Sequence, residues 1–137
     1  MATVTRSRRV DAPPATVREA IRDVEPFMRA AGFDEVSLDG DTLEIAQGMG
    51  LVRIELTLDV RRDADAALVY EQRDGIFDHM TTRYEVAEAD GGSEVTATTE
   101  FELGTAVVGS ALDGTVITRQ RTKEIEAQFD YLESELA

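Results

Sequence analysis

The sequence predicts an α+β fold in which a curved antiparallel sheet of seven strands packs against a long C-terminal helix. From about residue 34 to residue 103, apolar and polar residues alternate with a period of two, which is typical of strands with one buried face. Apolar residues recur at helical spacing after the first strand and again towards the C-terminus. A curved sheet that packs on the last helix would bury all of these apolar faces together.

The first elements are expected to be a strand and two short helices. Residues 3–10 indicate a strand, and Pro13 and Pro14 after it suit the first turn of a helix. A second short helix is expected to begin at Pro26 and to end at Gly32.

Six more strands follow, and the turns between them are of two kinds. The turns at 39–41, 61–66 and 89–93 are polar and contain Asp, whereas those at 47–51 and 73–80 contain large apolar residues. Because the connections between successive antiparallel strands alternate between two ends of the sheet, we expect the polar turns at one end and the apolar turns at the other. The apolar turn residues are Met49, Leu51, Ile76 and Phe77.

The last helix is expected from about Thr105 to the end of the chain, with an interruption in its apolar face. Arg119, Gln120 and Lys123 occupy this face, and Gly114 lies just before them. A glycine inside a helix costs roughly 1 kcal/mol relative to alanine, so it needs an explanation. Either small residues leave space above the sheet, or Gly114 separates two helical segments. The apolar positions are Val108, Leu112, Val116, Ile125, Phe129, Leu132 and Leu136.

The charge balance is the strongest signal in the composition. Asp and Glu number 28 against 14 Lys and Arg, the formal net charge is −14, and Lys123 is the only lysine. An acidic chain with little lysine suits a cytoplasm of very high salt, where the Debye length is a few Å and self-repulsion costs little. We therefore expect a halophilic protein with an acidic surface, whose circular dichroism changes when molar salt is lowered to millimolar. The absence of a basic stripe in the sequence argues against a nucleic-acid partner.

Length and composition restrict the other classes of protein. The 137 residues are expected to form one domain, 1–137, with its own core. The sequence has no cysteine, which excludes disulfides, thiolate metal sites and cysteine catalysis. No apolar run approaches the roughly 20 residues of a membrane span, and no signal peptide is recognisable, so we expect a cytoplasmic protein.

Two stretches of the sequence carry a resemblance to a known superfamily. Residues 8–21 read "RRVDAPPATVREAI", and the long final helix ends in "FDYLESEL". Together with the element order, they resemble the SRPBCC superfamily over essentially the whole chain, although a tryptophan often stands in that superfamily where this chain has Arg18. The superfamily contains START-like lipid-transfer domains, the birch-pollen-allergen fold, aromatic polyketide cyclases and coenzyme Q-binding proteins.

The resemblance implies a helix-grip fold with the order β-α-α-β-β-β-β-β-β-α and a cavity between sheet and helix that takes bulky apolar ligands. The mouth of this cavity would lie at the end of the sheet with the apolar turns. Ile76 and Phe77 would then form an apolar lip at the mouth or core packing under the last helix, and the two roles are not exclusive. The resemblance brings no shared catalytic signature, so it implies the function only as a class.

Strand parity selects the residues that are expected to face this cavity. A buried polar group needs a hydrogen-bond partner, so the polar members indicate either a mutually satisfied network or a wet ligand pocket, and we favour the pocket. The candidate ligand-binding residues are Gln47, Ile54, Leu56, Leu58, Tyr70, Gln72, Ile76, Phe77, Met80, Thr82, Tyr84, Thr99, Phe101, Leu112 and Val116.

The first strand adds two arginines to the candidates. Arg6 and Arg8 share the parity of Val10, and a buried arginine needs an anionic partner. They would contact a carboxylate or phosphate of the ligand or, as we favour, acidic residues at the rim of the sheet. His79 is expected to face outward and has no second histidine in the sequence to share a metal. We predict no metal, no cofactor and no specific catalytic residue.

The predicted function is binding or transport of a small or medium hydrophobic ligand, such as a lipid, isoprenoid, quinone or polyketide. One alternative is a polyketide cyclase or aromatase that uses the same cavity, with a tyrosine or arginine polarising a carbonyl. That alternative would need a paired acid and base in the cavity, and the sequence shows no clear pair. A second alternative is a co-chaperone-like interaction module, with Glu100 and Glu102 on the outer face of the sheet.

Overall fold

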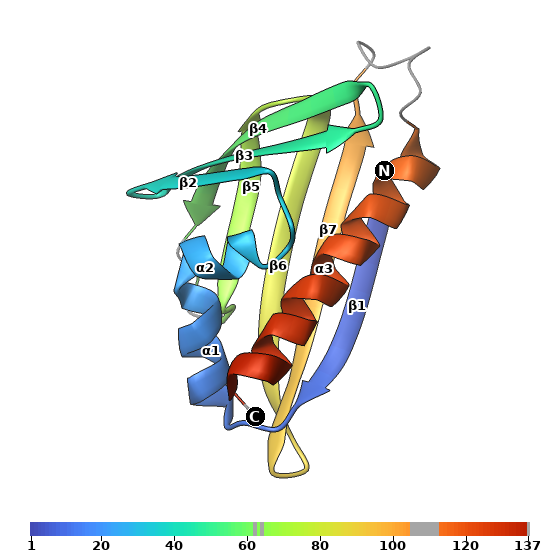
Figure 1. Ribbon diagram of the computed structural model, residues 1–137. Helices are drawn as coiled ribbons and strands as arrows, with labels where there is room; N and C mark the ends of the chain where they lie inside the picture. The colour runs from blue at the N-terminus through green and yellow to red at the C-terminus, as the bar shows by residue number, and fades with distance from the viewer. Residues whose placement is uncertain (62, 64, 105–112, 137) are drawn as a thin grey trace.

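The computed structural model describes residues 1–61, 63, 65–104 and 113–136. The predicted order of elements is confirmed: a strand, two short helices, six strands and a long helix (Figure 1). Part of the predicted last helix, with Val108 and Leu112, lies outside the described residues. The elements are β1 Ala2–Val10, α1 Pro14–Arg22, α2 Val24–Arg29, β2 Glu35–Asp39, β3 Thr42–Met49, β4 Val52–Arg61, β5 Leu68–Asp74, β6 Phe77–Ala89, β7 Gly92–Leu103 and α3 Gly114–Leu136.

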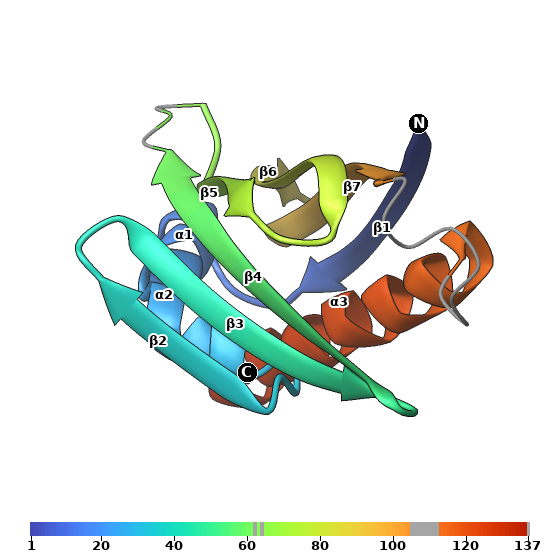
Figure 2. The ribbon, with the colours of Figure 1, turned by 90° about the horizontal axis from the view of Figure 1, so that it is seen from above.

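The strands form one antiparallel sheet in the order β1-β7-β6-β5-β4-β3-β2. The sheet is strongly curved, and β2, β3 and β4 turn across the other strands (Figure 1, Figure 2). On the concave side, α3 runs next to β1, while α1 and α2 cover the part that α3 leaves open (Figure 1). The predicted fold class, a curved seven-stranded antiparallel sheet around a long C-terminal helix, is confirmed.

The corner between β1 and α1 is fixed by the hairpin of β6 and β7. This hairpin turns at Asp90 and Gly91, whose φ angles of 46° and 82° are both positive, as in the tight turns that match the twist of paired strands. The turn places Ser93 opposite Val10, and the Ser93 hydroxyl donates to the carbonyl oxygen of Ala12 at 2.7 Å. The chain can therefore leave the sheet edge and begin α1 without exposing the core beneath.

The core lies between the concave face of the sheet and the helices. Tyr84 of β6 packs edge-on against Phe27 of α2, with ring centroids 5.0 Å apart. The residues that alternate inward along β3 to β7 are largely buried, as the alternation predicts, and the buried ones are Leu43, Ile45, Ile54, Leu56, Leu58, Val60, Leu68, Tyr70, Met80, Thr82, Tyr84, Val86, Val95, Ala97, Thr99 and Phe101.

The buried face of α3 differs from the predicted one at its beginning. The helix begins at Gly114, where the Asp113 carboxylate accepts a hydrogen bond from the Val116 N–H at 2.9 Å. Ile117 is buried and Val116 only half-buried, because steps of four residues back from Ile125 pass through Arg121 and Ile117. The buried residues of α3 are Ile117, Arg121, Glu124, Ile125, Gln128, Phe129 and Leu132.

Candidate ligand-binding site

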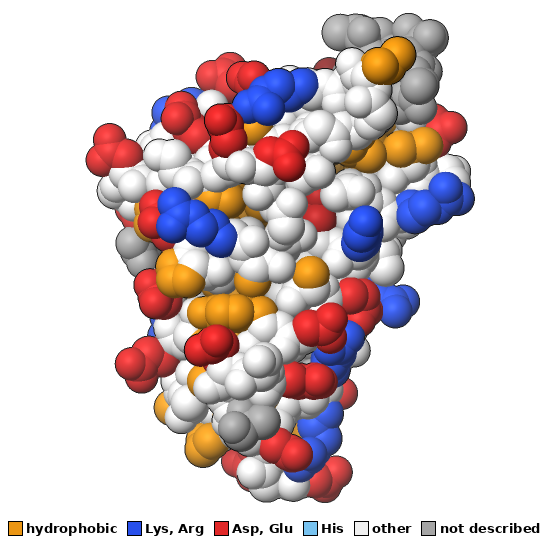
Figure 3. All heavy atoms as spheres, in the orientation of Figure 1, with side chains coloured by type: hydrophobic (Ala, Val, Ile, Leu, Met, Phe, Trp, Pro, Cys, Tyr) orange, Lys and Arg blue, Asp and Glu red, His pale blue; other side chains and the backbone are white. Residues whose placement is uncertain are grey.

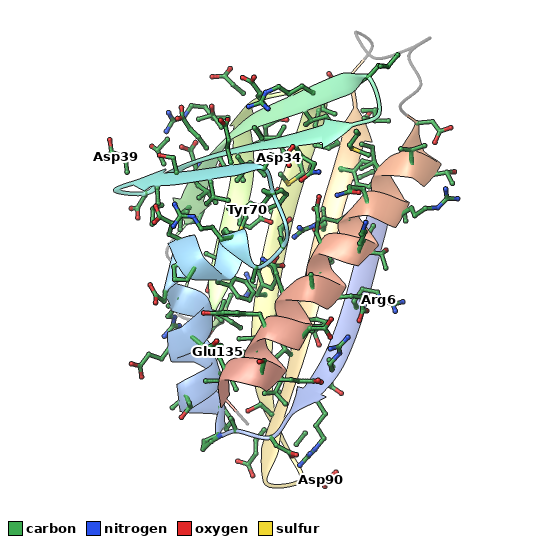
Figure 4. The ribbon with its side chains drawn as sticks, in the orientation of Figure 1. Arg6, Asp34, Asp39, Tyr70, Asp90 and Glu135 are labelled. Carbon is green, nitrogen blue, oxygen red and sulfur yellow. The ribbon has the colours of Figure 1, made fainter. Side chains whose placement is uncertain are left out.

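A cavity of about 70 Å³ lies between the concave face of the sheet and α3. This volume corresponds to about five water molecules. Tyr70 lies in the space between the sheet and α3 (Figure 4). The lining residues are Phe33, Ile45, Gln47, Met49, Ile54, Leu56, Tyr70, Phe77, Met80, Thr99, Phe101, Ile117, Gln120, Arg121 and Glu124.

The cavity extends towards the end of the sheet that carries the two apolar turns. Met49 and Phe77 come from these turns, and with Phe33 they line the cavity while remaining only partly buried. Phe77 also packs on Phe101, with ring centroids 5.6 Å apart. Ile76 does not line the cavity and packs against the hydrophobic core. The two roles expected for the pair are therefore divided, with Phe77 at the rim of the cavity and Ile76 in the packing beside it.

Arg121 is the charged centre of the cavity wall. Its Nη2 donates to the hydroxyl oxygens of Tyr70 and Tyr84, at 2.8 Å in both cases. Its Nε donates to Oγ1 of Thr99 at 2.9 Å, and its Nη1 donates to the Glu124 carboxylate at 3.2 Å. Since Arg121 is only 8% exposed, these hydrogen bonds replace its hydration.

Tyr84 is held from both sides in this cluster. Its hydroxyl accepts a hydrogen bond from Arg121 and donates to Oε1 of Gln128 at 2.6 Å. The Gln128 amide nitrogen in turn donates to the carbonyl oxygen of Phe27 at 3.2 Å, which connects the cluster to α2. Burial raises the pKa of the Tyr84 hydroxyl, while the charge of Arg121 opposes this shift. The hydroxyl therefore keeps its proton and serves as a fixed donor to Gln128.

Glu124 brings a carboxyl group into the same cavity. It is 7% exposed, and it accepts hydrogen bonds from Arg121 at 3.2 Å and from the Gln120 amide at 3.1 Å. Burial raises the pKa of this carboxyl group, while Arg121 and Gln120 oppose the shift. The cavity thus holds a buried acid beside a buried cation and a tyrosine hydroxyl, a group that was not predicted from the sequence.

The predicted ligand-binding residues separate into two groups in the structure. One group lines the cavity: Gln47, Ile54, Leu56, Tyr70, Phe77, Met80, Thr99 and Phe101. A second group lies beside the cavity without lining it: Leu58, Gln72, Ile76, Thr82, Tyr84 and Val116. Leu112 lies outside the described residues.

The polar residues of the second group have internal partners that keep them off the cavity wall. Gln72 exchanges hydrogen bonds with the backbone of Phe77, at 2.7 Å and 3.1 Å. The hydroxyls of Thr82 and Thr99 are 2.8 Å apart and form a hydrogen bond. The inward polar residues were expected to form either a satisfied hydrogen-bond network or a ligand pocket. Gln72 and Thr82 belong to such a network, while Gln47, Tyr70 and Thr99 line the cavity.

Arg6 and Arg8 lie at the edge of the sheet and do not line the cavity. Arg6 donates to Glu126 of α3 at 2.9 Å, and Arg8 pairs with Glu126 and with Asp130. The alternation along β1 predicts correctly on which side of the sheet both arginines lie, but not that they stay partly exposed. They are exposed because β1 is an edge strand whose side chains reach past the flank of α3. Arg6 lies at this edge in Figure 4, and acidic and basic side chains lie side by side along the same flank in Figure 3. The structure thus favours acidic residues of α3, rather than a ligand anion, as the partners of both arginines.

The sequence reasoning missed Arg121 and Glu124. The signal was present in the spacing, since Ile117, Arg121 and Ile125 are separated by steps of four residues.

His79 is exposed, as expected, and within the described residues no group of three His, Cys, Asp or Glu side chains is placed to hold a metal ion. In the part of the chain that the structure describes, no helix has the length and apolar character to cross a membrane.

Solved structures of other proteins share this fold at low sequence identity. A protein of Thermus thermophilus is 18% identical, with a TM-score of 0.75 over 97% of this chain and 95% of its own. A START superfamily protein of Mycobacterium smegmatis is 12% identical, with a TM-score of 0.72 over 98% and 96% of the two chains. An aromatase/cyclase of a Streptomyces species is 17% identical, with a TM-score of 0.74 over 96% and 93%. No curated protein matches the sequence.

The sequence also matches a protein family over its whole length. Residues 1–137 match the family described as polyketide cyclase/dehydrase and lipid transport. The resemblance to the SRPBCC superfamily is confirmed by this match and by the START and aromatase/cyclase structures with the same fold. The chain therefore belongs to the polyketide cyclase/dehydrase and lipid transport family.

Proposed function

We propose that the protein binds a compact, largely apolar molecule in this cavity and holds an oxygen atom of the ligand at the hydroxyl of Tyr70. The observation that carries the proposal is the Arg121 cluster in the wall of an otherwise mostly apolar cavity. A buried cation and its partners are costly to maintain, and a purely apolar wall would fill the same space without that cost. The family, which includes cyclases and lipid-transport proteins, supports a ligand of this kind.

Tyr70 is better suited than Arg121 to contact the ligand. Arg121 directs Nη2 at the two tyrosines, Nε at Thr99 and Nη1 at Glu124. Tyr70 accepts one of these hydrogen bonds, and a hydroxyl that accepts from a cation becomes a stronger donor. Because the Tyr84 proton goes to Gln128, the Tyr70 proton is the one that can turn towards a ligand oxygen in the cavity.

Glu124 indicates the charge of the ligand. Its carboxylate lies 3.2 Å from Arg121, so the two charges compensate each other inside the cavity. A ligand carboxylate at Tyr70 would add a second negative charge that Arg121 would have to share. The site therefore favours an uncharged oxygen, such as that of a ketone or an aldehyde, over an anion.

The volume of the cavity limits the size of the ligand. Sites for drug-sized ligands occupy roughly 300–1,000 Å³, well above the 70 Å³ of this cavity. A single aromatic ring with a carbonyl group already exceeds the volume of about five water molecules, so the site encloses it only after side-chain adjustments at the rim. A longer lipid or polyketide would have to displace rim residues such as Phe33, Met49 and Phe77.

The proposal is tested by titrating the protein with acetophenone, a compact aromatic ketone, and following its amide resonances by NMR. We expect the substitution Tyr70→Phe to weaken binding about tenfold, because it removes the hydroxyl and keeps the ring. Tyr131→Phe is the matched control, since Tyr131 lies on α3 and does not line the cavity. Equal affinity in Tyr70→Phe and wild type, or no binding to wild type, would contradict the proposal.

A cyclase or dehydrase activity in the same cavity is a second candidate, and the position of Glu124 favours it. Tyr70, polarised by Arg121, would stabilise negative charge that develops on a ketone oxygen. Glu124, whose pKa burial raises, would accept a proton from the carbon next to that carbonyl group. This step is the first half of an aldol closure, and it leaves the proton on Glu124 and the negative charge on the oxygen at Tyr70.

Hydrogen exchange separates this candidate from simple binding. An enzyme of this kind should accelerate the exchange of the methyl protons of acetophenone in D₂O, as measured by proton NMR. We expect Glu124→Gln to slow the exchange by about 10²-fold or more while binding is retained. Binding of acetophenone without accelerated exchange would leave the binding function and remove the enzymatic one.

Glu100 and Glu102 are exposed on β7, and the interaction-module alternative based on them stays a prediction.

A further inference from the structure

The side chain of Gln47 has only part of its hydrogen bonds, and Gln47 is one of the residues that line the cavity. Its amide nitrogen donates to the carbonyl oxygen of Gly48 at 3.1 Å. Its Oε1 is buried and has no hydrogen-bond partner among the described residues. Rotating the amide by half a turn would place two oxygens against each other at Gly48, so the contact with Gly48 fixes the orientation. A residue that lines the cavity thus carries a buried acceptor without a donor.

The missing hydrogen bond at Oε1 distinguishes Gln47 from two other inward-facing glutamines. Gln72 uses both ends of its amide on the backbone of Phe77. Gln128 accepts from Tyr84 and donates to Phe27. Neither lines the cavity, whereas Gln47 does. The only one of the three that lines the cavity is therefore the one whose oxygen lacks a donor.

Gln47 and Tyr70 belong to different parts of the cavity wall. Gln47 is near the end of β3, opposite Ile54, and lies next to the hairpin that carries Met49. Tyr70 is on β5, where its partner on β4 is Val60, six positions along the strand from Ile54. A ligand whose oxygen accepts from Tyr70 therefore reaches Gln47 with a different atom.

We propose that Gln47 is a second polar contact of the ligand, and that its Oε1 accepts a hydrogen bond from a ligand hydroxyl or N–H group. This inference rests on the proposed function and specifies the ligand class further. The ligand is a compact molecule with two polar groups on an apolar frame: an oxygen that accepts from Tyr70 and a donor that reaches Gln47. A hydroxylated aromatic ketone has this chemistry, whereas a simple hydrocarbon or an unsubstituted ketone has only part of it.

The test compares acetophenone with its ortho-, meta- and para-hydroxy derivatives in NMR titrations of three proteins. In the wild type, at least one hydroxy derivative should bind about five- to tenfold more tightly than acetophenone, the gain of one hydrogen bond. In Gln47→Met, which keeps the length of the side chain and removes the acceptor, the hydroxy derivatives and acetophenone should bind with equal affinity. In Tyr131→Phe, the control on α3 outside the cavity, the preference should persist.

The outcomes separate this inference from the proposed function. If acetophenone binds the wild type and no hydroxy derivative binds more tightly, a ligand donor at Gln47 is excluded and the binding function stands. The inference is also overturned if Gln47→Met keeps the preference, because the hydroxyl group then has another partner. If none of the probes binds the wild type, both the proposed function and this inference are contradicted.

Discussion

Arginine side chains lie on two faces of helix α3: Arg121 of the helix itself on the inner face, and Arg6 and Arg8 of β1 on the outer flank. The inner and outer arginines differ in burial and in partners. On the inner face, Arg121 is 8% exposed and directs its N–H groups at two tyrosines, Thr99 and Glu124. On the outer flank, the side chains of Arg6 and Arg8 are 49% and 24% exposed and pair with acidic residues of α3. The outer partners are Glu126, Asp130 and Glu133.

The comparison separates the arginine that lines the cavity, Arg121, from the two that join the edge strand β1 to α3, Arg6 and Arg8. The outer ion pairs join β1 to α3, and Arg8 also lies over the ring of Phe129 at 5.5 Å. Exposed ion pairs of this kind are each worth about 0–1 kcal/mol. The inner cluster brings both charges of its ion pair out of water, so removing one member leaves the other buried and unpaired. The inner arginine should therefore be far less replaceable than the outer ones.

Replacing the arginines by methionine should show the largest difference between the two faces. Arg121→Met leaves Glu124 without its cation, and we expect it to lower the free energy of unfolding by about 3–5 kcal/mol. Arg6→Met should lower it by no more than about 1 kcal/mol. Urea denaturation measures both values. Adding Glu124→Leu to Arg121→Met should recover part of the loss, and equal losses from the two single substitutions would contradict the comparison.

The pH dependence of stability should have opposite signs for two carboxyl groups of α3. Burial raises the pKa of Glu124, so its contribution to stability is present below the ordinary glutamate pKa of about 4.3 and is lost as the pH rises through the raised value. Hydrogen bonds from Arg6 and Arg8 lower the pKa of Glu126, so its contribution is present above the ordinary value and is lost as the pH falls through the lowered one.

Urea denaturation between about pH 3 and pH 7 checks these signs. The wild type should lose stability relative to Glu124→Gln as the pH rises above the ordinary glutamate range. It should lose stability relative to Glu126→Gln as the pH falls below that range. Parallel curves for the wild type and Glu124→Gln would show that the inner carboxyl group has an ordinary pKa, and the site would then lack a tuned acid.

The outer ion pairs should give the smallest effect and the one most sensitive to salt. Arg8→Gln removes the contacts with Glu126 and Asp130, and we expect a loss of about 1 kcal/mol or less in dilute buffer. In molar salt the loss should shrink further, since the Debye length is then about 3 Å. The difference in urea midpoint between the two salt concentrations measures this. A loss that is large and independent of salt would show that Arg8 acts through packing on Phe129 rather than through charge.

The sheet could be predicted from the sequence because the period of a strand leaves little freedom. Once Ile54 and Leu56 face inward, every second residue of β4 must follow, and the polar or apolar character of each turn indicates its end of the sheet. The inward faces of the strands follow from these two signals, whereas the helix-grip order and a cavity mouth near Met49 and Phe77 are what the resemblance to the SRPBCC superfamily implies.

The polar part of the site could not be predicted in the same way. An apolar stripe on α3 contains no charged residue by definition, so the predicted stripe runs through Val116 and passes beside Arg121. The sequence also cannot distinguish Gln47 from Gln72, which share the inward parity. Their difference comes from the turn before β6, which folds the backbone of Phe77 onto Gln72 and leaves Gln47 facing the cavity. Such contacts depend on tertiary structure that parity does not report.

The central claim is that the cavity under α3 encloses a ligand, and intermolecular NOEs test it most directly. The measurement uses protein with labelled methyl groups, saturated with acetophenone. We predict NOEs from the probe to the methyl groups of Leu56, Met80 and Ile117, which all line the cavity. NOEs confined to methyl groups outside the cavity, such as those of the exposed Leu51, or no NOEs at all, would contradict the claim.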